Sequence, residues 1–147
     1  MRINMPVNNL ERHMNENDYL VSKTNAKGVI IYVNQPFIDI SGYSKQELIG
    51  QAHNLVRHPD MPPGAFEDLW KTIQQGKPWS GLIKNRAKDG SFYWVYANVA
   101  PIYESGQITG YMSVRSKPTR EQILEAEALY REMREGRCRF KIEAGEL

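Results

Sequence analysis

The 147-residue sequence contains a single cysteine, Cys138, and no long hydrophobic run. One cysteine excludes an internal disulfide and a CxxC metal site. A membrane helix needs about 20 consecutive apolar residues, whereas the longest apolar stretch here is the short segment 29–33. The first residues also lack the apolar core and small-residue cleavage site of a secretion signal. We therefore expect a soluble, cytoplasmic chain.

The sequence also lacks a charge bias and the signatures of common enzymes. Its 19 basic and 17 acidic residues give a net charge of +2, so no overall field favours nucleic acid or anionic lipid. It has no pair of catalytic carboxylates, no nucleophile with a base signature and no glycine-rich phosphate loop. His13, His53 and His58 have no recognised metal-ligand spacing. We expect neither an enzyme nor a metal site.

Hydrophobic residues make up 41% of the sequence, which is enough for one compact core. Periodicity, capping residues and turn glycines predict strands and helices that alternate with short turns. In chain order we expect strands at 19–24 and 29–33, short helices at 35–40 and 44–49, an irregular turn at 51–62, a helix at 63–75, strands at 79–86, 91–102 and 108–115, and a helix from 119. This order predicts an α+β domain, with a five-stranded antiparallel sheet, helices over one face and a C-terminal helix.

The domain boundaries follow from the same pattern. Residues 1–17 are rich in asparagine and charge, and we interpret them as an N-terminal cap or arm. Residues 18–116 form the domain itself, and residues 117–147 form an output helix and tail. A layout with helices over one face of a sheet leaves a cavity between the two layers.

Several short motifs occur in a characteristic order within residues 18–116. Asn34 follows the second strand, Gly42-Tyr43-Ser44 precedes Glu47-Leu48-x-Gly50, and Asn85-x-x-Lys88-Asp89-Gly90 precedes Tyr93-Trp94. In order and spacing they resemble the PAS family. The blocks His53-Asn54-Leu55-Val56-Arg57-His58-Pro59-Asp60-Met61-Pro62, Lys77-Pro78-Trp79-Ser80-Gly81 and Gly110-Tyr111-Met112-Ser113-Val114-Arg115 resemble its aerotaxis-receptor branch.

The resemblance implies a function as well as a PAS fold. Members of the aerotaxis-receptor branch bind FAD and pass its redox state to a chemotaxis signalling domain. We therefore expect this chain to be the amino-terminal sensor of a longer, inner-membrane-anchored receptor, with membrane association only through downstream segments absent from this sequence. FMN in place of FAD remains open.

Two polar residues are the main candidates for contacts with the flavin ring. Asn85 corresponds to an asparagine that pairs with the ring in light-sensing PAS relatives, and its amide offers the donor and acceptor that a pyrimidine edge needs. The alternative is a role in the following turn. Arg115 stands where those relatives place a glutamine, and a buried cation there favours an anionic reduced flavin. The alternative is an exposed arginine on an edge strand.

The irregular turn supplies a second group of candidates. Arg57, His58 and Asp60 are expected to contact a phosphate or ribose of FAD, or else to form a salt-bridged turn. His53 falls where the light-sensing relatives carry their reactive cysteine, so covalent photochemistry is not expected, and we include His53 among the cofactor-binding candidates.

Two aromatic residues and one further asparagine complete the predicted cofactor site. Trp79 is expected to line the cavity by stacking on a ring of the cofactor. For Trp70 a role in the core is favoured over such stacking. Asn34 is also a candidate, although a turn role is slightly favoured.

Two other functions stay open at this stage. A haem-binding PAS gas sensor would use His53 or His58 to ligate iron. A cofactor-free PAS module would serve dimerisation or docking. In each case the helix from Thr119 is the expected output, and it would dock on a neighbouring domain or on a second copy of the chain.

Overall fold

A computed structural model of the chain describes residues 4–136. Cys138 and the predicted tail at 137–147 lie outside the described residues. Within the described part of the chain, no helix has the length and apolar character needed to cross a membrane.

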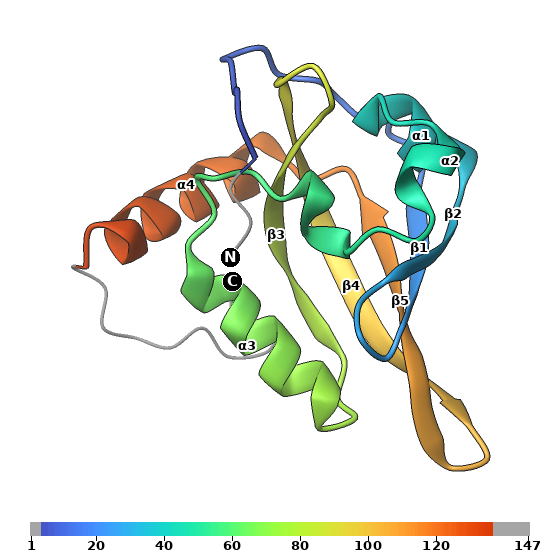
Figure 1. The fold of residues 1–147 in the computed structure, drawn as a ribbon. Coiled ribbons are helices and arrows are strands. Elements are labelled where there is room, and N and C mark those ends of the chain that lie inside the picture. Colours follow the sequence, from blue (N-terminus) through green and yellow to red (C-terminus); the bar gives the residue numbers. More distant parts are fainter. Residues whose placement is uncertain (1–3, 137–147) are drawn as a thin grey trace.

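The centre of the molecule is a five-stranded antiparallel sheet (Figure 1), as the sequence predicted. Its strands are β1 (Leu20–Asn25), β2 (Ile30–Val33), β3 (Trp79–Arg86), β4 (Phe92–Glu104) and β5 (Gln107–Ser116). Their spatial order is β2-β1-β5-β4-β3. The first strand therefore lies beside the last, and β2 and β3 form the two edges.

One face of the sheet is covered by the helices that follow β2 (Figure 1). They are α1 (Gln35–Ser41), α2 (Lys45–Leu48), the 3₁₀ helix η1 (His53–Val56) and α3 (Pro63–Gln74). The helix η1 forms within the predicted irregular turn. Capping explains where two of the chain's helices begin: Ser44 with Glu47 and Thr119 with Gln122 form the two predicted capping boxes.

The C-terminal helix α4 (Arg120–Arg134) packs on the opposite face of the sheet. Side chains alternate between the two faces of a strand. On β3, Ile83 faces the cavity beneath η1 and α3, whereas the adjacent Leu82 belongs to the side where α4 docks. Tyr130 of α4 stacks on Trp94 of β4 with an angle of 14° between the rings. Both faces of the sheet are therefore covered at β3.

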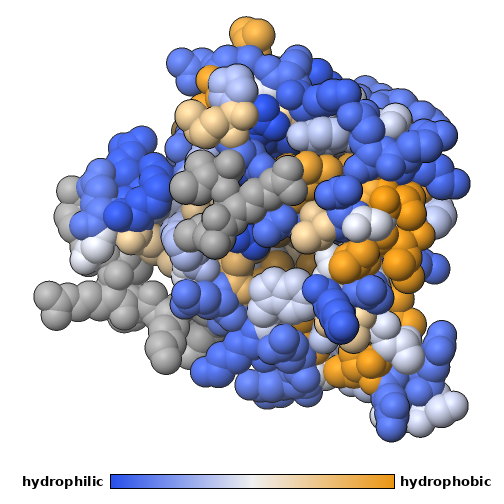
Figure 2. All heavy atoms as spheres, viewed as in Figure 1, coloured by the Kyte–Doolittle hydropathy of each residue, from blue (hydrophilic) through white to orange (hydrophobic). Residues whose placement is uncertain are grey.

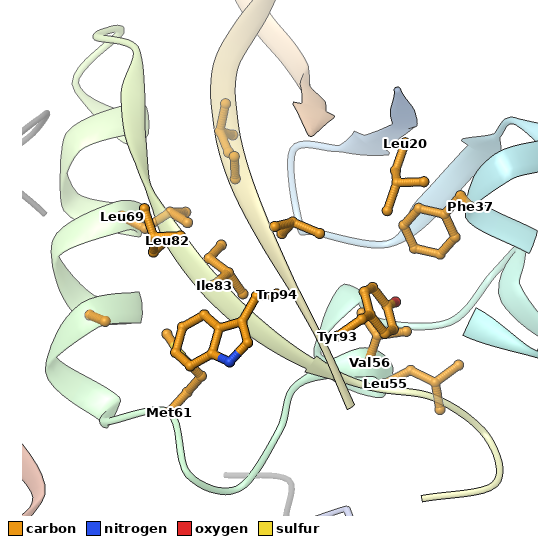
Figure 3. Packing of buried hydrophobic residues seen from close by; sticks show 14 of the residues in the cluster. Leu20, Phe37, Leu55, Val56, Met61, Leu69, Leu82, Ile83, Tyr93 and Trp94 are labelled. Atoms are coloured by element: carbon orange, nitrogen blue, oxygen red, sulfur yellow. The ribbon is translucent and has the colours of Figure 1, made fainter. Parts of the chain in front are cut away.

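The hydrophobic core continues through the sheet because β3 and β4 bury side chains on both faces. Figure 3 shows Ile83 and Leu69 between α3 and the sheet, with Met61 near Trp94. A second part of the core surrounds Phe37 and Leu20 at the start of the chain's first strand. The surface seen in Figure 2 is mostly hydrophilic, and its hydrophobic part lies on the side of β2.

The segment 50–61, which we call the crossing segment, runs across the face of the sheet from one edge to the other. At the β2 edge, Gly50 N–H donates to Ile30 O over 2.8 Å and Ile30 N–H donates to Gln51 O over 2.9 Å. At the β3 edge, Arg57 forms a backbone bridge with Asn85, and His58 N–H donates to Lys84 O over 3.4 Å. The same segment therefore occupies part of both edges.

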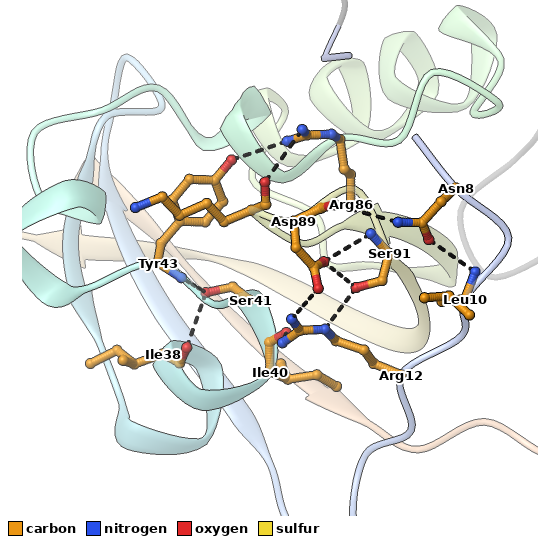
Figure 4. A network of polar contacts seen from close by, with 11 residues as sticks. Asn8, Leu10, Arg12, Ile38, Ile40, Ser41, Tyr43, Arg86, Asp89 and Ser91 are labelled. Atoms are coloured by element: carbon orange, nitrogen blue, oxygen red, sulfur yellow. Dashed lines mark hydrogen bonds and ion pairs between the residues drawn. The ribbon is translucent and has the colours of Figure 1, made fainter. Parts of the chain in front are cut away.

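Residues 4–17 lie along the end of the sheet where β3 turns into β4 (Figure 4). Arg12 donates to Asp89 Oδ2 over 2.9 Å and to Ser91 Oγ over 2.7 Å. Nearer the start of the chain, Asn4 Nδ2 donates to the carbonyls of Asn54 and Arg57 at 2.9 and 2.8 Å. This N-terminal part thus supports the crossing segment from outside.

Candidate functional site

A cavity of about 340 Å³ lies between the sheet and the layer formed by η1 and α3. Pockets for organic ligands typically measure roughly 300–1,000 Å³. The cavity wall combines inward-facing strand residues with residues of the crossing segment and of α3. Its lining residues are Ser22, Thr24, Lys27, Gly28, Ala52, His53, Asn54, Val56, Arg57, Phe66, Leu69, Trp70, Ile73, Ile83, Asn85, Val99, Tyr111, Ser113 and Arg115.

Arg115 of β5 is a buried cation in this wall, with 3% of its surface exposed. Its guanidinium donates to Leu20 O over 3.3 Å and to Ser22 Oγ over 3.1 Å. Burial lowers the pKa of Arg115 to about 10, which leaves it charged at neutral pH. The sequence left open an exposed position on an edge strand, but β5 is a central strand and the side chain is buried.

His53 of η1 is the third partner of Arg115. The distance between Arg115 Nη2 and His53 Nε2 is 2.7 Å. Because a guanidinium can only donate, His53 Nε2 accepts this bond, and the neutral ring carries its proton on Nδ1. Burial, followed by the charge of Arg115, lowers the pKa of His53 to about 3. The ring is therefore neutral at physiological pH.

No carboxylate lines the cavity within residues 4–136. Arg115 and Arg57 both lack an ion pair with an acidic side chain among these residues. Arg57 lies over the ring of Phe66, 3.7 Å from its centroid, and burial lowers its pKa. Among the residues that the structure describes, these two cations of the cavity wall therefore have only neutral partners.

Two buried polar atoms of the wall have no hydrogen-bond partner among the described residues. They are Arg57 Nε and Ser113 Oγ. A buried polar group without a partner destabilises the protein by about 1–3 kcal/mol. A ligand that offers acceptors and donors at these positions would remove that penalty.

Asn85 and Trp70 also line the cavity, from β3 and α3 respectively. Asn85 is buried, with 3% of its surface exposed, and faces the same side of the sheet as Ile83. Trp70 is half-buried and meets Tyr111 edge to face, with 5.6 Å between ring centroids. A Cβ atom at Gly28 would lie only 2.9 Å from the ring of Trp70, so the β1–β2 turn needs glycine to approach this ring.

Asn34 and Trp79 lie outside the cavity wall. Asn34 Oδ1 accepts from Val21 N–H and Phe37 N–H, and it thereby caps α1 and fixes the end of β1. Trp79 is fully buried, and its indole N–H donates to Asp68 Oδ2 on α3 over 2.8 Å. It therefore joins α3 to β3, and we leave both residues out of the site.

His58 and Asp60 also lie away from the cavity, on the side of β3 where α4 docks. His58 Nδ1 accepts from Asp60 N–H over 3.0 Å, and its ring meets Phe92 edge to face. Asp60 forms an ion pair with Lys84 at 2.8 Å. This geometry corresponds to the alternative of a salt-bridged turn, so of the three residues in the predicted turn cluster only Arg57 remains in the site.

Several polar residues of the wall are not part of any motif in the sequence, among them Ser22. Tyr111 and Ser113 also line the wall but were not predicted as site residues. They could have been identified from the alternation of side chains along a strand, in which every second residue points to the same face of the sheet. Once Arg115 faces the cavity, Ser113 and Tyr111 must face it as well. Ser22 follows because it pairs with Ser113 across β1 and β5.

His53 gives the protein a predicted sensitivity to acid. The pKa of His53 is about 3 in the folded protein and 6.5 ordinarily. Between these two pH values the unfolded chain binds a proton at His53 that the folded protein does not bind. The free energy of unfolding therefore falls as the pH falls, by roughly 2–3 kcal/mol for this group at about pH 4.5. His53→Gln, which keeps an acceptor for Arg115, is expected to remove most of this pH-dependent loss of unfolding free energy.

Urea unfolding at about pH 7 and about pH 4.5 measures the effect. His13→Gln is the matched control because the side chain of His13 is 55% exposed. The same loss of stability in the wild type and in His53→Gln would contradict the assignment.

The chain matches the PAS fold family over residues 30–115. It is 48% identical over 126 residues to the aerotaxis receptor of Escherichia coli (strain K12), a match that covers 86% of this chain and 25% of that receptor. It is 30% identical over 96 residues to the nitrogen fixation regulatory protein of Klebsiella pneumoniae, over 65% of this chain and 19% of that protein. The chain thus spans about a quarter or less of the length of these curated relatives.

Solved structures are similar as well. The dark structure of the blue-light photoreceptor Aureochrome1 LOV has a TM-score of 0.66 and 25% identity, over 76% of this chain and 86% of that one. A PAS domain of a protein from Colwellia psychrerythraea has a TM-score of 0.58 and 30% identity, over 69% of this chain and 86% of that one.

Proposed function

Because this chain belongs to the PAS fold family and is similar to an aerotaxis receptor over most of its length, we propose that it binds FAD and signals the redox state of that cofactor. It passes the signal to a chemotaxis signalling domain of a longer receptor. No turnover of a substrate is part of this function. The chain acts as one copy or as a homodimer.

The observation that carries the proposal is the environment of Arg115. Its buried guanidinium faces a ligand-sized cavity, and its hydrogen-bond partners among residues 4–136 are a carbonyl, a hydroxyl and a neutral imidazole. A buried cation without a carboxylate attracts negative charge strongly. A ring that gains negative charge when it takes up electrons fits such a position.

Other residues of the wall have the chemical character that a flavin site needs. Asn85 supplies an amide donor and acceptor, and Ser113 Oγ has no hydrogen-bond partner within residues 4–136. A flat ring needs apolar surface around it. Aliphatic side chains from α3 and β3, such as Leu69 and Ile83, supply this surface. Lys27 is exposed and Arg57 half-buried at the same cavity, so both offer cations to the phosphates of FAD.

A bound FAD supplies reversible uptake of electrons. The role of the protein is to respond to the resulting change of charge. Arg115 is suited to this role because its present acceptors are neutral and are therefore weaker partners than an anion. Asn85 can exchange donor for acceptor by turning its amide. Re-pairing of these two side chains favours one of two arrangements of the wall.

The same contacts disfavour haem. His53 is the histidine that lines the cavity, and its Nε2 already accepts from Arg115. His58 lies on the other side of β3, where its Nδ1 accepts from Asp60 N–H. Ligation of iron by either ring would require these bonds to break.

Acid extraction of the purified chain, followed by chromatography of the released cofactor, tests the proposal. We expect FAD at about one molecule per chain, and the two broad absorption bands of oxidised flavin before extraction. FMN in the extract would correct the cofactor but keep the flavin. A sharp Soret band, or a colourless protein that binds no added FAD, would overturn the proposal.

A further inference from the structure

Helix α4 binds two backbone carbonyls, one on β3 and one on the crossing segment, and these two elements also contribute residues to the cavity wall. Tyr130 Oη donates to Leu82 O on β3 over 2.6 Å. Arg134 Nη1 donates to Asp60 O on the crossing segment over 2.6 Å. Residues four apart lie on the same face of a helix. One side of α4 therefore bridges β3 and the crossing segment.

The two bridged parts meet at the cavity itself. Asn85 and Arg57, whose backbones form the bridge between β3 and the crossing segment, both line the cavity. Just outside this bridge, His58 N–H donates to Lys84 O, and Lys84 Nζ pairs with Asp60 Oδ2 over 2.8 Å. A change at Asn85 or Arg57 that alters their spacing must therefore shift Asp60 O relative to Leu82 O.

We propose that α4 responds to the cavity through this bridge, because Tyr130 and Arg134 can hold both carbonyls only at one separation of β3 and the crossing segment. When the separation changes, one of the two bonds breaks and the last turns of α4 loosen. This inference rests on the proposed function in one respect, since the redox state of FAD is the natural cause of the change.

The bridge differs from the direct connection between β5 and α4 in where it acts. The connection through residues 117–119 enters α4 at its first turn, where Thr119 caps the helix. Tyr130 and Arg134 lie in the second half of the helix. A signal through the connection would alter the first turn, whereas a signal through the bridge alters the end of α4.

Amide hydrogen exchange along α4 distinguishes the two routes. The FAD-loaded chain is compared in its oxidised form and after reduction by dithionite. In the wild type we expect the exchange rates of residues 127–135 to differ at least about threefold between the two forms. In Arg134→Gln this difference should disappear while the flavin spectrum is retained. Arg131→Gln is the matched control, since Arg131 is an exposed arginine on the same helix and makes the same change of charge.

A double-mutant cycle tests the bridge without any flavin. Asn85→Ala is expected to speed exchange at the end of α4 in the apoprotein, and this effect should vanish in the Arg134→Gln background. Additive effects in the cycle, or a redox difference that persists in Arg134→Gln or is confined to residues 120–123, would overturn the inference. Absence of flavin with a coupled cycle would overturn the proposed cofactor and leave the bridge standing.

Discussion

Replacing Arg115 with alanine is expected to leave FAD bound but to make its first reduction harder, with a midpoint potential lower by roughly 60–120 mV. Each tenfold change in a one-electron equilibrium corresponds to about 59 mV. Two unit charges 4 Å apart attract by about 4 kcal/mol at an effective dielectric constant of 20. A change of one or two factors of ten in the reduction equilibrium therefore requires less free energy than this attraction supplies. The cause is the charge of Arg115, which is buried and has no carboxylate beside it in the described part of the chain.

Spectroscopic titration with a reductant of known potential measures the shift. Arg115→Lys is the matched variant because it retains the positive charge but loses the planar guanidinium. In the wild type that guanidinium contacts Leu20, Ser22 and His53. It should recover more than half of the lost potential. An unchanged potential in flavin-loaded Arg115→Ala would remove Arg115 from the proposed mechanism.

Replacing Ser113 with phenylalanine is expected to abolish flavin binding, with an affinity for FAD at least about a hundredfold weaker. Ser113 projects from the central strand β5 into the cavity, so the larger side chain would occupy part of its volume of about 340 Å³. Because that volume accommodates it, the fold should survive. The expected product is a colourless protein with cooperative thermal unfolding.

Met112→Phe is the control for this substitution. Met112 precedes Ser113 on the same strand and points to the opposite, exposed face, where 38% of its surface is accessible. The control should bind FAD like the wild type. Wild-type flavin content in Ser113→Phe would mean that the cofactor lies elsewhere, while loss of flavin in both variants would point to general damage to the sheet.

The fold could be predicted from the sequence because its determinants are local. Alternation, turn glycines and capping boxes lie within a few residues of the features that they produce, as at Ser44 and Glu47. The PAS motifs then indicated a five-stranded antiparallel sheet with helices over one face, whereas the spatial order of the strands came from the structure. The inward direction of Asn85 followed from its strand and its family position.

The cavity wall was harder to predict because it depends on the path of the crossing segment. Arg57, His58 and Asp60 are neighbours in sequence, yet the chain leaves η1 in an extended conformation at Arg57. The bridge to Asn85 then sends Arg57 toward the cavity and Asp60 toward Lys84. That division depends on contacts with β3, 24 residues further on in the case of Asp60 and Lys84, and no local pattern encodes it.

Trp79 illustrates a different limit. Its strand position gives the correct face of the sheet, since it pairs with Val99, which lines the cavity. Asp68 on α3 accepts its indole N–H and so draws the ring under the helix. Whether an inward-facing aromatic residue meets a ligand or a helix depends on how α3 packs against β3, and no local pattern of the sequence encodes that packing.

The crossing segment has a consequence for association between chains. An uncovered outer strand offers a row of backbone groups that can template a strand from another molecule, and such growth leads to aggregation. Gly50 and Gln51 interrupt that row at Ile30, while His58 and Tyr130 interrupt it at Lys84 and Leu82. Addition of a strand from another molecule is therefore blocked at these positions of both edges.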